Sequence, residues 1–444
     1  MKKIVASVGL VAVGATGLQA DLLPGLTTES GKPFTLAATL RGFYDSNPST
    51  LPSSSNPQGS FGFEISPGIE FAFPMEQTSL SFGFIYDYKW YDHELVNSTG
   101  HDNQTYDFHA ALNHAFSERY SVSVKESYVI GQEPDFLRAG NSFTTFQSYS
   151  GNNTRNYGAI DFTAQLTPQF GLELGYANTL TGFADDDGRA TSTPPYNIIS
   201  ISNAGLMNAL DNVVHLDGRY QLQPQTIGIL GFQFRETLYT ADQAIGYYQG
   251  IPGRPYEMSG DRNASSYYGY VGADHNFRPD LTGSIRLGGR YTDYYNTPTP
   301  QNQASPYAMA SLKYTYLPES SVQFGGSFDY IPSSLPGGVS TSPGTINQIN
   351  ASAQAGTVFA AVSHRIMPKL YGGLQAQYQN TSFYGGTYNN QRENFYLVGL
   401  NLRYQFTPNF SSEIGYNYDN LQSNVPAQGS YDRNRVYIGV TGSY

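Results

Sequence analysis

Hydrophobic and polar residues alternate along long stretches of this chain, and the alternation is clearest in residues 78–91. Every second position from 80 to 90 is aromatic or aliphatic, whereas the positions between are small or polar apart from Ile85. Because successive side chains of a β-strand point to opposite faces, this pattern predicts a strand with one apolar face. Residues 59–73 repeat the pattern, and 74–77 between them are long enough for a hairpin turn.

Short turns of this kind recur along the chain and alternate with long polar segments. Most carry a proline, which cannot donate to a sheet ladder and therefore marks strand ends. The short turns are expected at 74–77, 117–120, 168–169, 224–225, 279–280, 318–319, 368–369 and 408–409. The long segments are rich in Gly, Ser, Asn, Thr and Pro and lie near 45–58, 93–104, 132–154, 181–211, 241–263, 296–304, 332–350, 382–391 and 420–433.

This alternation of short and long connections predicts an all-β fold, a transmembrane antiparallel β-barrel with short periplasmic turns and long extracellular loops. Eight short turns imply sixteen strands, and one further strand at each end, 34–44 and 433–444, gives about eighteen. Sixteen strands are also compatible with the pattern. In the longest loop, 181–211, we expect the apolar residues of 194–210 to form a short helix or to fold into the pore.

The first residues have the pattern of a secretory signal peptide. Lys2 and Lys3 precede a short apolar run, which ends at the small residue Ala20. The run is too short to be a typical membrane-spanning helix. We therefore expect residues 1–20 to be a cleaved signal peptide, 21–33 a periplasmic lead, and 34–444 a single outer-membrane barrel.

Composition and charge support this interpretation. Charged residues make up only 13% of the chain, against about 25% in average soluble domains, and aromatic residues 14%. The net charge of −11 becomes −13 once the two lysines of the signal peptide are removed, and an acidic chain does not suit nucleic acid as a partner. There are no cysteines, so disulfides and cysteine-ligated metals are excluded. No cofactor is indicated.

If the apolar faces point outward, the polar residues between them line the lumen. The candidate pore-lining residues are Asp87, Lys89, Asp107, Asp217, Arg219, Arg235, Arg286, Arg290, Lys313, Arg403 and Glu413. We hypothesise that Arg219, Arg235, Arg286 and Arg290 form a basic wall near a constriction. The alternative is that such charges pair across adjacent strands and hold the wall together.

The end of the chain resembles the terminal signal of porin-like barrels. Val436, Ile438 and Val440 share one face with the terminal Tyr444, although Gly442 replaces the usual bulky residue. In addition, residues 166–176, with an echo at 406–416, look like hairpins of the Putative beta-barrel porin type 2 family. This resemblance implies an outer-membrane barrel whose partners are membrane lipids, the barrel-assembly machinery, periplasmic chaperones and small hydrophilic solutes.

Catalytic and metal chemistry have little support in the sequence. The seven histidines share no motif with a nucleophile, and a serine hydrolase would need Ser, His and an acid within reach of one another. A lipase that acts on membrane lipid from the outer wall of the barrel is an alternative, but such an enzyme would show no local sequence motif. The acidic turn 185–188 could bind calcium, but it lacks the ligand spacing of a calcium loop. We therefore expect no enzyme, no catalytic residues and no metal site.

The function that fits best is a porin-like channel for passive diffusion of small hydrophilic solutes, in the outer membrane of a Gram-negative bacterium. One alternative is a polysaccharide-export barrel, because tyrosine-rich surfaces suit sugars. Another is a structural or adhesive surface barrel, in which the long loops would carry out the function. The oligomeric state could be a monomer or a trimer. No strand has an obviously less lipid-like outer face, which favours a monomer.

Overall fold

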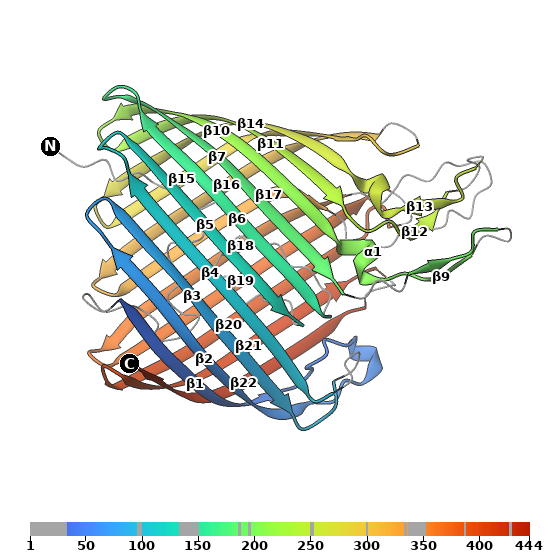
Figure 1. Cartoon of the computed structure of the whole chain (residues 1–444), viewed down its shortest axis with the longest axis horizontal. Coiled ribbons are helices and arrows are strands. Elements are labelled where there is room, and N and C mark those ends of the chain that lie inside the picture. Colours follow the sequence, from blue (N-terminus) through green and yellow to red (C-terminus); the bar gives the residue numbers. More distant parts are fainter. Residues whose placement is uncertain are drawn as a thin grey trace.

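A closed β-barrel dominates the computed structural model (Figure 1). The structure describes residues 33–95, 100–132, 151–184, 188–193, 197–248, 253–298, 301–332, 335, 352–385, 388–425 and 429–444. The expected signal peptide and most of the acidic turn 185–188 lie outside these residues. Within the described part, 18 strands form one antiparallel sheet, and β1 pairs with β22 to close it. The prediction of about eighteen strands is confirmed.

The barrel strands are long enough to cross a bilayer when tilted. Their bounds are β1 Phe34–Asp45, β2 Ser60–Pro74, β3 Thr78–Tyr91, β4 Asp102–Ala115, β5 Tyr120–Gly131, β6 Asn153–Gln165, β7 Phe170–Phe183, β10 Ala209–Gln223, β11 Thr226–Tyr239, β14 Ala264–Arg278, β15 Leu281–Tyr294, β16 Gln301–Leu317, β17 Ser320–Pro332, β18 Ser352–Met367, β19 Leu370–Tyr384, β20 Arg392–Thr407, β21 Phe410–Ser423 and β22 Tyr431–Ser443.

Each short turn expected from the sequence joins two paired strands, from β2–β3 at 74–77 to β20–β21 at 408–409. At the same end, two backbone hydrogen bonds complete the seam between the first and the last strand. There the backbone N–H of Leu36 donates to the carbonyl of Tyr444 at 3.0 Å, and that of Tyr444 donates to Leu36 at 2.8 Å. The C-terminus therefore lies at the end of the barrel that carries the short turns (Figure 1).

Short elements in two long loops form a cap at the other end of the barrel. They are β8 Arg189–Ala190, β9 Ile198–Ser200, α1 Asn203–Met207, β12 Ala244–Tyr247, β13 Tyr256–Met258 and the 3-10 helix η3 Ser259–Arg262; a further 3-10 helix, η2 Ser53–Ser55, lies in the first loop. In Figure 1 the cap elements extend beyond the ends of the barrel strands. The expected short helix within 194–210 is α1.

The cap is held by an apolar cluster and by one buried cation. Leu206 and Met207 of α1 pack with Phe183 at the end of β7 and with Ile245 of β12. The guanidinium of Arg262 donates to the carbonyl of Leu206 at 2.7 Å and lies 4.0 Å above the ring of Tyr239. These contacts join the two long loops to each other and to the barrel rim.

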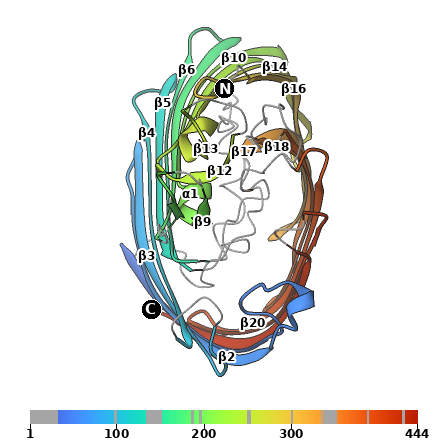
Figure 2. The same cartoon turned by 90° about the vertical axis from the view of Figure 1, so that its right-hand side faces the viewer.

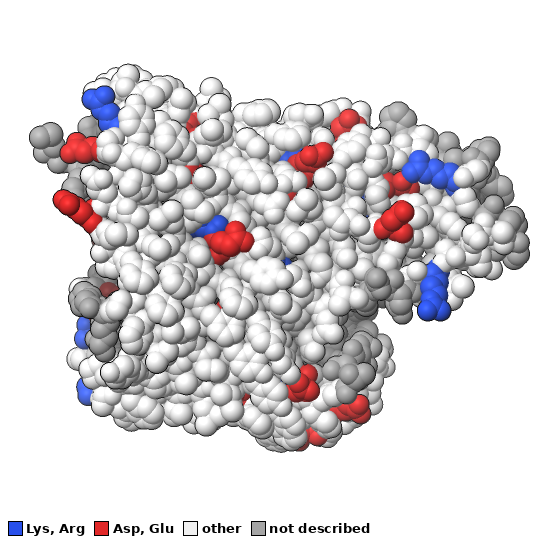
Figure 3. Space-filling view, viewed as in Figure 1, with Lys and Arg blue, Asp and Glu red and all other residues white. Residues whose placement is uncertain are grey.

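Side chains alternate between the two faces of the wall, as the sequence pattern predicts. In β7, Glu173 and Gly175 are buried, whereas Leu174 and Tyr176 are 50% and 42% exposed. A soluble protein would show the opposite distribution, because its large apolar side chains are usually buried. The face of the outer wall seen in the space-filling view is largely free of charge (Figure 3). Among the described residues, no helix has the length and apolar character needed to cross a bilayer.

Candidate functional site: the inner wall of the barrel

Charged side chains from many strands meet on the inner wall, and the alternation within each strand determines which residues reach it. In β10, for example, His215 and Asp217 are buried, while Leu216 and Tyr220 are exposed on the outside. Adjacent paired strands continue the same alternation. Residues opposite one another in the register therefore share a face.

All the sequence-predicted pore-lining residues occupy inward-facing positions of their strands. Asp87, Asp107, Asp217, Arg286, Arg290 and Glu413 are buried, Lys89, Arg219, Arg235 and Arg403 are half-buried, and Lys313 is exposed near the short-turn end of β16. That they line a conducting pore stays a prediction.

The four arginines of the hypothesised basic wall lie on neighbouring strands β10, β11 and β15, with β14 among them. Each faces a carboxylate. Arg219 Nη1 lies 3.0 Å from Glu173 Oε2, Arg235 Nη2 2.9 Å from Asp211 Oδ2, Arg286 Nη1 2.8 Å from Asp274 Oδ1, and Arg290 Nη1 3.6 Å from Asp329 Oδ1. The arginines are therefore gathered on one wall, but their charge is compensated there, as the pairing alternative requires.

A second group of charges lies across the seam where the barrel closes. Arg41 of β1 donates from Nη1 to Glu64 of β2 at 2.9 Å, and its Nε contacts Glu413 of β21. The guanidinium also lies 5.3 Å from the ring centre of Tyr437 on β22. One arginine thus links the first two strands of the barrel with the last two.

A buried cluster of Asp161, Glu173 and His215 is a feature that the sequence did not reveal. One ligand-type atom from each residue lies within 4.8 Å of the others. The residues come from β6, β7 and β10, and no local spacing connects them. The hairpin turn at 168–169 by itself places Asp161 opposite Gly175. The position of His215 beside them does not follow from a short turn, because β7 pairs with β10 across the longest loop.

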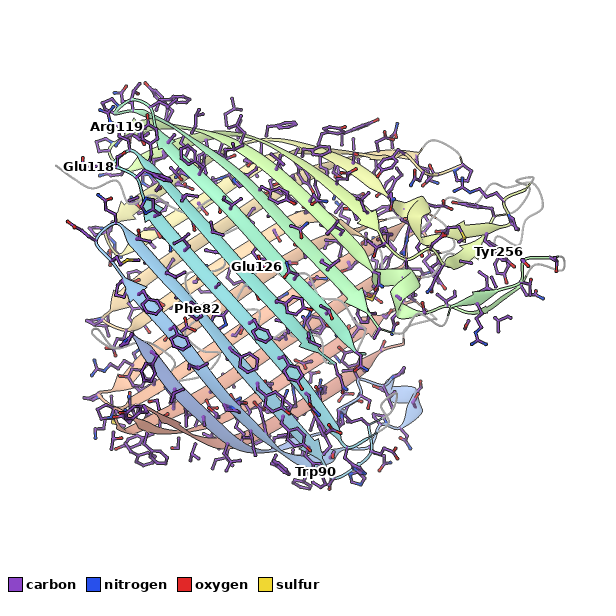
Figure 4. All side chains as sticks on the ribbon, viewed as in Figure 1. Phe82, Trp90, Glu118, Arg119, Glu126 and Tyr256 are labelled. Atoms are coloured by element: carbon purple, nitrogen blue, oxygen red, sulfur yellow. The ribbon has the colours of Figure 1, made fainter. Side chains whose placement is uncertain are left out.

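The outer wall carries exposed aromatic side chains at both ends of the strands. Phe82 and Trp90, labelled in Figure 4, belong to β3 and lie on its outer face. Such aromatic belts are typical of the two interfaces of a membrane. In the terminal strand, the proposed assembly-signal residues are exposed on the outside: Val436, Ile438, Val440 and Tyr444. Their role in assembly stays a prediction.

Glu126 of β5 is a charged residue on the outer wall, near its middle (Figure 4). Its carboxylate lies over Gly158 of β6, where an added Cβ would be 2.8 Å from Oε2. Beyond Gly158 the same outer row contains Asn178 and Asn212, whose side chains share a hydrogen bond of 2.9 Å. The expectation that no strand has a less lipid-like outer face is therefore wrong for β5 to β10.

Comparisons with known proteins agree with the barrel fold. The family model described as Putative beta-barrel porin 2 matches residues 255–444, which contain β14 to β22. No curated protein matches the chain. Of the two resembling hairpin segments, 406–416 lies within the match and 166–176 outside it.

Three solved structures illustrate the similarity. A BenF-like porin from Pseudomonas fluorescens Pf-5 has a TM-score of 0.45 at 12% identity, covering 93% of this chain and 99% of that chain. The outer membrane protein OpdK from Pseudomonas aeruginosa has a TM-score of 0.43 at 11% identity, with the same coverages of 93% and 99%. The ferric enterobactin receptor PfeA from Pseudomonas aeruginosa has a TM-score of 0.46 at 8% identity, covering 94% and 81%.

The inward charges, the apolar outer wall and the family match lead to one assignment. The chain is a porin-like β-barrel of the outer-membrane type, and residues 255–444 match the Putative beta-barrel porin 2 family.

Proposed function

We propose that this barrel is a passive pore for small hydrophilic solutes in the outer membrane of a Gram-negative bacterium. The observation that carries the proposal is the closure of 18 strands around a charged inner wall, with an apolar wall outside. Barrels of 16–18 strands are wide enough to leave an aqueous channel, whereas barrels of about eight are filled by side chains. Solutes would diffuse down their gradient without energy coupling.

The distribution of charge favours weak ion selectivity. Acidic residues such as Glu70, Asp87 and Asp107 lie on β2 to β4, and the four arginines lie on β10 to β15. Figure 2 places β2 at one end of the oval barrel and β10 and β14 at the other, with β3 and β4 along the side between them. A transverse field of this kind orients polar solutes and adjusts selectivity in a pore. Because the arginines are paired with acids, we expect the field to be modest.

The cap would restrict entry on one side of the pore. In the view along the barrel, α1, β12 and β13 overlap the region enclosed by the wall (Figure 2), and the cap packs on the ends of β7 and β11. Tyr256 of β13 donates to the carbonyl of Thr191 at 2.7 Å, so the two loops hold one another in place. The described residues of the 181–211 loop thus favour a cap at the mouth of the barrel.

Two measurements test the proposal. Proteoliposomes should swell in monosaccharides and disaccharides and respond less as the sugar becomes larger. Planar bilayers should show single channels with a small reversal potential in a salt gradient, because the inner wall carries both signs of charge. Folded barrel that admits no sugar and conducts no ions would contradict the pore and leave a structural or adhesive role.

We further propose that the terminal strand carries the recognition signal for the barrel-assembly machinery and its chaperones. Its apolar residues lie on the outer face, and it pairs with β1 to complete the barrel. A single closed barrel is sufficient for the proposed pore. The function therefore does not depend on whether the protein is a monomer or a trimer.

A further inference from the structure

Three ligand-type side chains converge on the inner wall at one place. Asp161 of β6 and His215 of β10 lie in the same register row, separated only by Gly175 of β7. Glu173 projects from the next inward-facing position of β7. Because the three strands are hydrogen-bonded to one another, the backbone holds the side chains in fixed relative positions.

The distances between these side chains are too long for hydrogen bonds but suit a shared ion. His215 Nε2 lies 3.7 Å from Asp161 Oδ1 and 3.7 Å from Glu173 Oε1. Hydrogen bonds from nitrogen to oxygen fall at about 2.7–3.2 Å. Two ligands of a tetrahedral zinc ion, each about 2.0–2.2 Å from the metal, are separated by about 3.4 Å. The two distances to His215 Nε2 therefore need to shorten only slightly for a cation to be shared with these oxygens.

The converging atoms are buried without hydrogen-bond partners. Glu173 is 1% exposed and His215 2%. Glu173 Oε1 and both ring nitrogens of His215 have no hydrogen bond within the described structure. A buried polar atom left without a partner destabilises the folded protein. A bound cation would satisfy Nε2 and the carboxylate oxygen at once.

A second histidine in the same barrel lies in a similar cluster, in which a hydrogen bond joins the histidine to one of the two acids. His109 of β4 also lies between two acids, Glu70 and Asp107. Its Nε2 is 2.7 Å from Glu70 Oε2, a normal hydrogen-bond length. The residue types are alike, but only at His215 do both acids lie beyond hydrogen-bond reach of Nε2.

Two neighbouring residues suit the cluster to metal binding: Arg219 orients one of the ligands, and Gly175 leaves space for the other two. Arg219 donates to Glu173 Oε2 at 3.0 Å, which directs the other oxygen, Oε1, toward His215. Outer partners of this kind are common at metal sites. At position 175 a Cβ would overlap both the ring of His215 and the carboxylate of Asp161, so glycine is needed there.

The cluster also has a route to solvent. A cavity of about 370 Å³ is lined by Asp161, Thr163 and Glu173, together with residues of the 74–77 turn at the short-turn end of the barrel. An ion could therefore reach the two carboxylates from the periplasmic side, with His215 behind them.

We propose that Asp161, Glu173 and His215 form a binding site for one divalent transition-metal ion of the zinc type. Imidazole nitrogen favours zinc and its neighbours over magnesium and calcium, which prefer sets of six or more oxygens. Three protein ligands leave the fourth tetrahedral position to water from the cavity. The ion would join β6, β7 and β10 from the inside of the wall. This site departs from the expectation, drawn from the sequence, that the chain has no metal site.

Lys125 of β5 gives the proposal a gain-of-affinity test. Its Nζ is buried without a hydrogen bond in the described structure, and its charge acts on Asp161. A cation there competes electrostatically with a metal ion. Replacing it by methionine, Lys125→Met, should therefore tighten zinc binding, whereas a merely structural cluster would show no change in zinc affinity.

The experiment uses the full barrel, folded in detergent, purified without a histidine tag and treated with chelator. Calorimetry with Zn²⁺ should show one ion per chain, and X-ray absorption of the zinc-loaded protein should show nitrogen and oxygen ligands only. His215→Gln and Glu173→Gln should each weaken binding at least tenfold. His109→Gln is the matched control and should bind zinc like the wild type.

Three results would overturn the site. They are no zinc bound by the folded wild type, equal affinities of the His215→Gln and His109→Gln variants, and calcium or magnesium bound as tightly as zinc. Retained resistance to unfolding in cold detergent confirms that each variant is folded. If a ligand variant does not fold, the Lys125→Met variant provides the test. A zinc affinity of this variant equal to or weaker than that of the wild type rejects the proposal. None of these outcomes bears on conductance, so the pore is tested separately.

Discussion

Arg433 and Asp45 form a buried ion pair between the last strand and the first, although they are 388 residues apart in the sequence. Arg433 Nε lies 3.0 Å and 2.9 Å from the two carboxylate oxygens of Asp45. The carboxylate also accepts the backbone N–H of Asn47 at 3.0 Å. This pair fixes the seam of the barrel at its long-loop end, while the contacts of Leu36 with Tyr444 fix the other end.

Removing one partner of this pair should destabilise the closed barrel. Asp45→Ala leaves the guanidinium of Arg433 buried without its acid, which costs about 3–5 kcal/mol in comparable cases. Urea unfolding of the refolded barrel in lipid vesicles measures the loss. The double variant with Arg433→Met should lose less than the sum of the two single variants. Additive losses would contradict a direct coupling between the two side chains.

The paired arginines of the inner wall lead to a prediction about selectivity. Replacing Arg219, Arg235, Arg286 and Arg290 by alanine exposes the acids that they neutralise. The pore should then favour cations, and the reversal potential in a salt gradient should shift accordingly. The opposite change, Asp211→Asn with Asp274→Asn, should shift it toward anions. Unchanged conductance and selectivity in both variants would show that these residues do not line the ion path.

The cap should loosen as the pH rises toward 7. Burial raises the pKa of Glu257 in β13 from 4.5 to about 7; Asp261 adds to this effect, and Arg262 opposes it. The folded cap therefore holds the proton more tightly than the unfolded loop does. Its stability is complete below pH 4.5 and falls between pH 4.5 and 7, by at most about 3 kcal/mol for this shift.

Amide exchange of β12 and β13 at pH 5 and pH 8, corrected for the intrinsic rates, measures this change. Glu257→Gln should reduce the pH dependence and keep the cap better protected at pH 8, while Asp261, whose pKa is also raised by burial, accounts for the remaining dependence. Glu76→Gln, an exposed position at the opposite end of the barrel, is the control and should behave like the wild type. A cap that exchanges equally at both pH values in the wild type would rule out Glu257 as the cause.

The carboxylate of Glu126 faces the lipid side of β5 near the middle of the wall (Figure 4). A charge at this depth costs a barrel free energy, less for an acid than for lysine or arginine. Glu126→Leu should therefore stabilise the barrel in lipid vesicles by about 1–2 kcal/mol in urea unfolding. If the variant is instead less stable, and light scattering shows that it has lost an oligomer present in the wild type, this wall is a contact between subunits.

The terminal residue allows assembly to be separated from stability. Tyr444→Ala removes the outward aromatic ring but keeps the two backbone hydrogen bonds with Leu36. We expect less folded barrel in the outer membrane of cells, while the protein refolded in vitro keeps its unfolding midpoint within error. Tyr404→Ala, an outward tyrosine in β20, is the matched control. Equal membrane levels of the two variants would reject Tyr444 as an assembly signal.

Much of the fold followed from local features of the chain. Prolines at 74, 168, 224, 279, 318, 368 and 408 mark short turns, and the alternation between them shows which residues face outward. Each hairpin register follows from its own turn, as for Asp161 opposite Gly175. The number of strands and the inward direction of the charged residues could therefore be predicted.

Several partners of the inward charges could not be predicted, because they depend on pairings that cross long loops. Asp161 meets His215 only when β7 pairs with β10 across the 181–211 loop. Asp45 meets Arg433 only when the first and last strands close the barrel. The polar row beside Glu126 extends over several strands and is visible only when their registers are known.

The sequence by itself determined the period of the strands, the position of the turns and therefore the two faces of the wall. These properties depend on neighbours along the chain, since a side chain's face is set by its place in its own strand. Only the tertiary structure decided which buried charges are neutralised and which buried nitrogen and oxygen atoms are left facing one another. Those outcomes depend on the alignment of strands that the chain brings together from far apart, and that alignment is a property of the closed barrel.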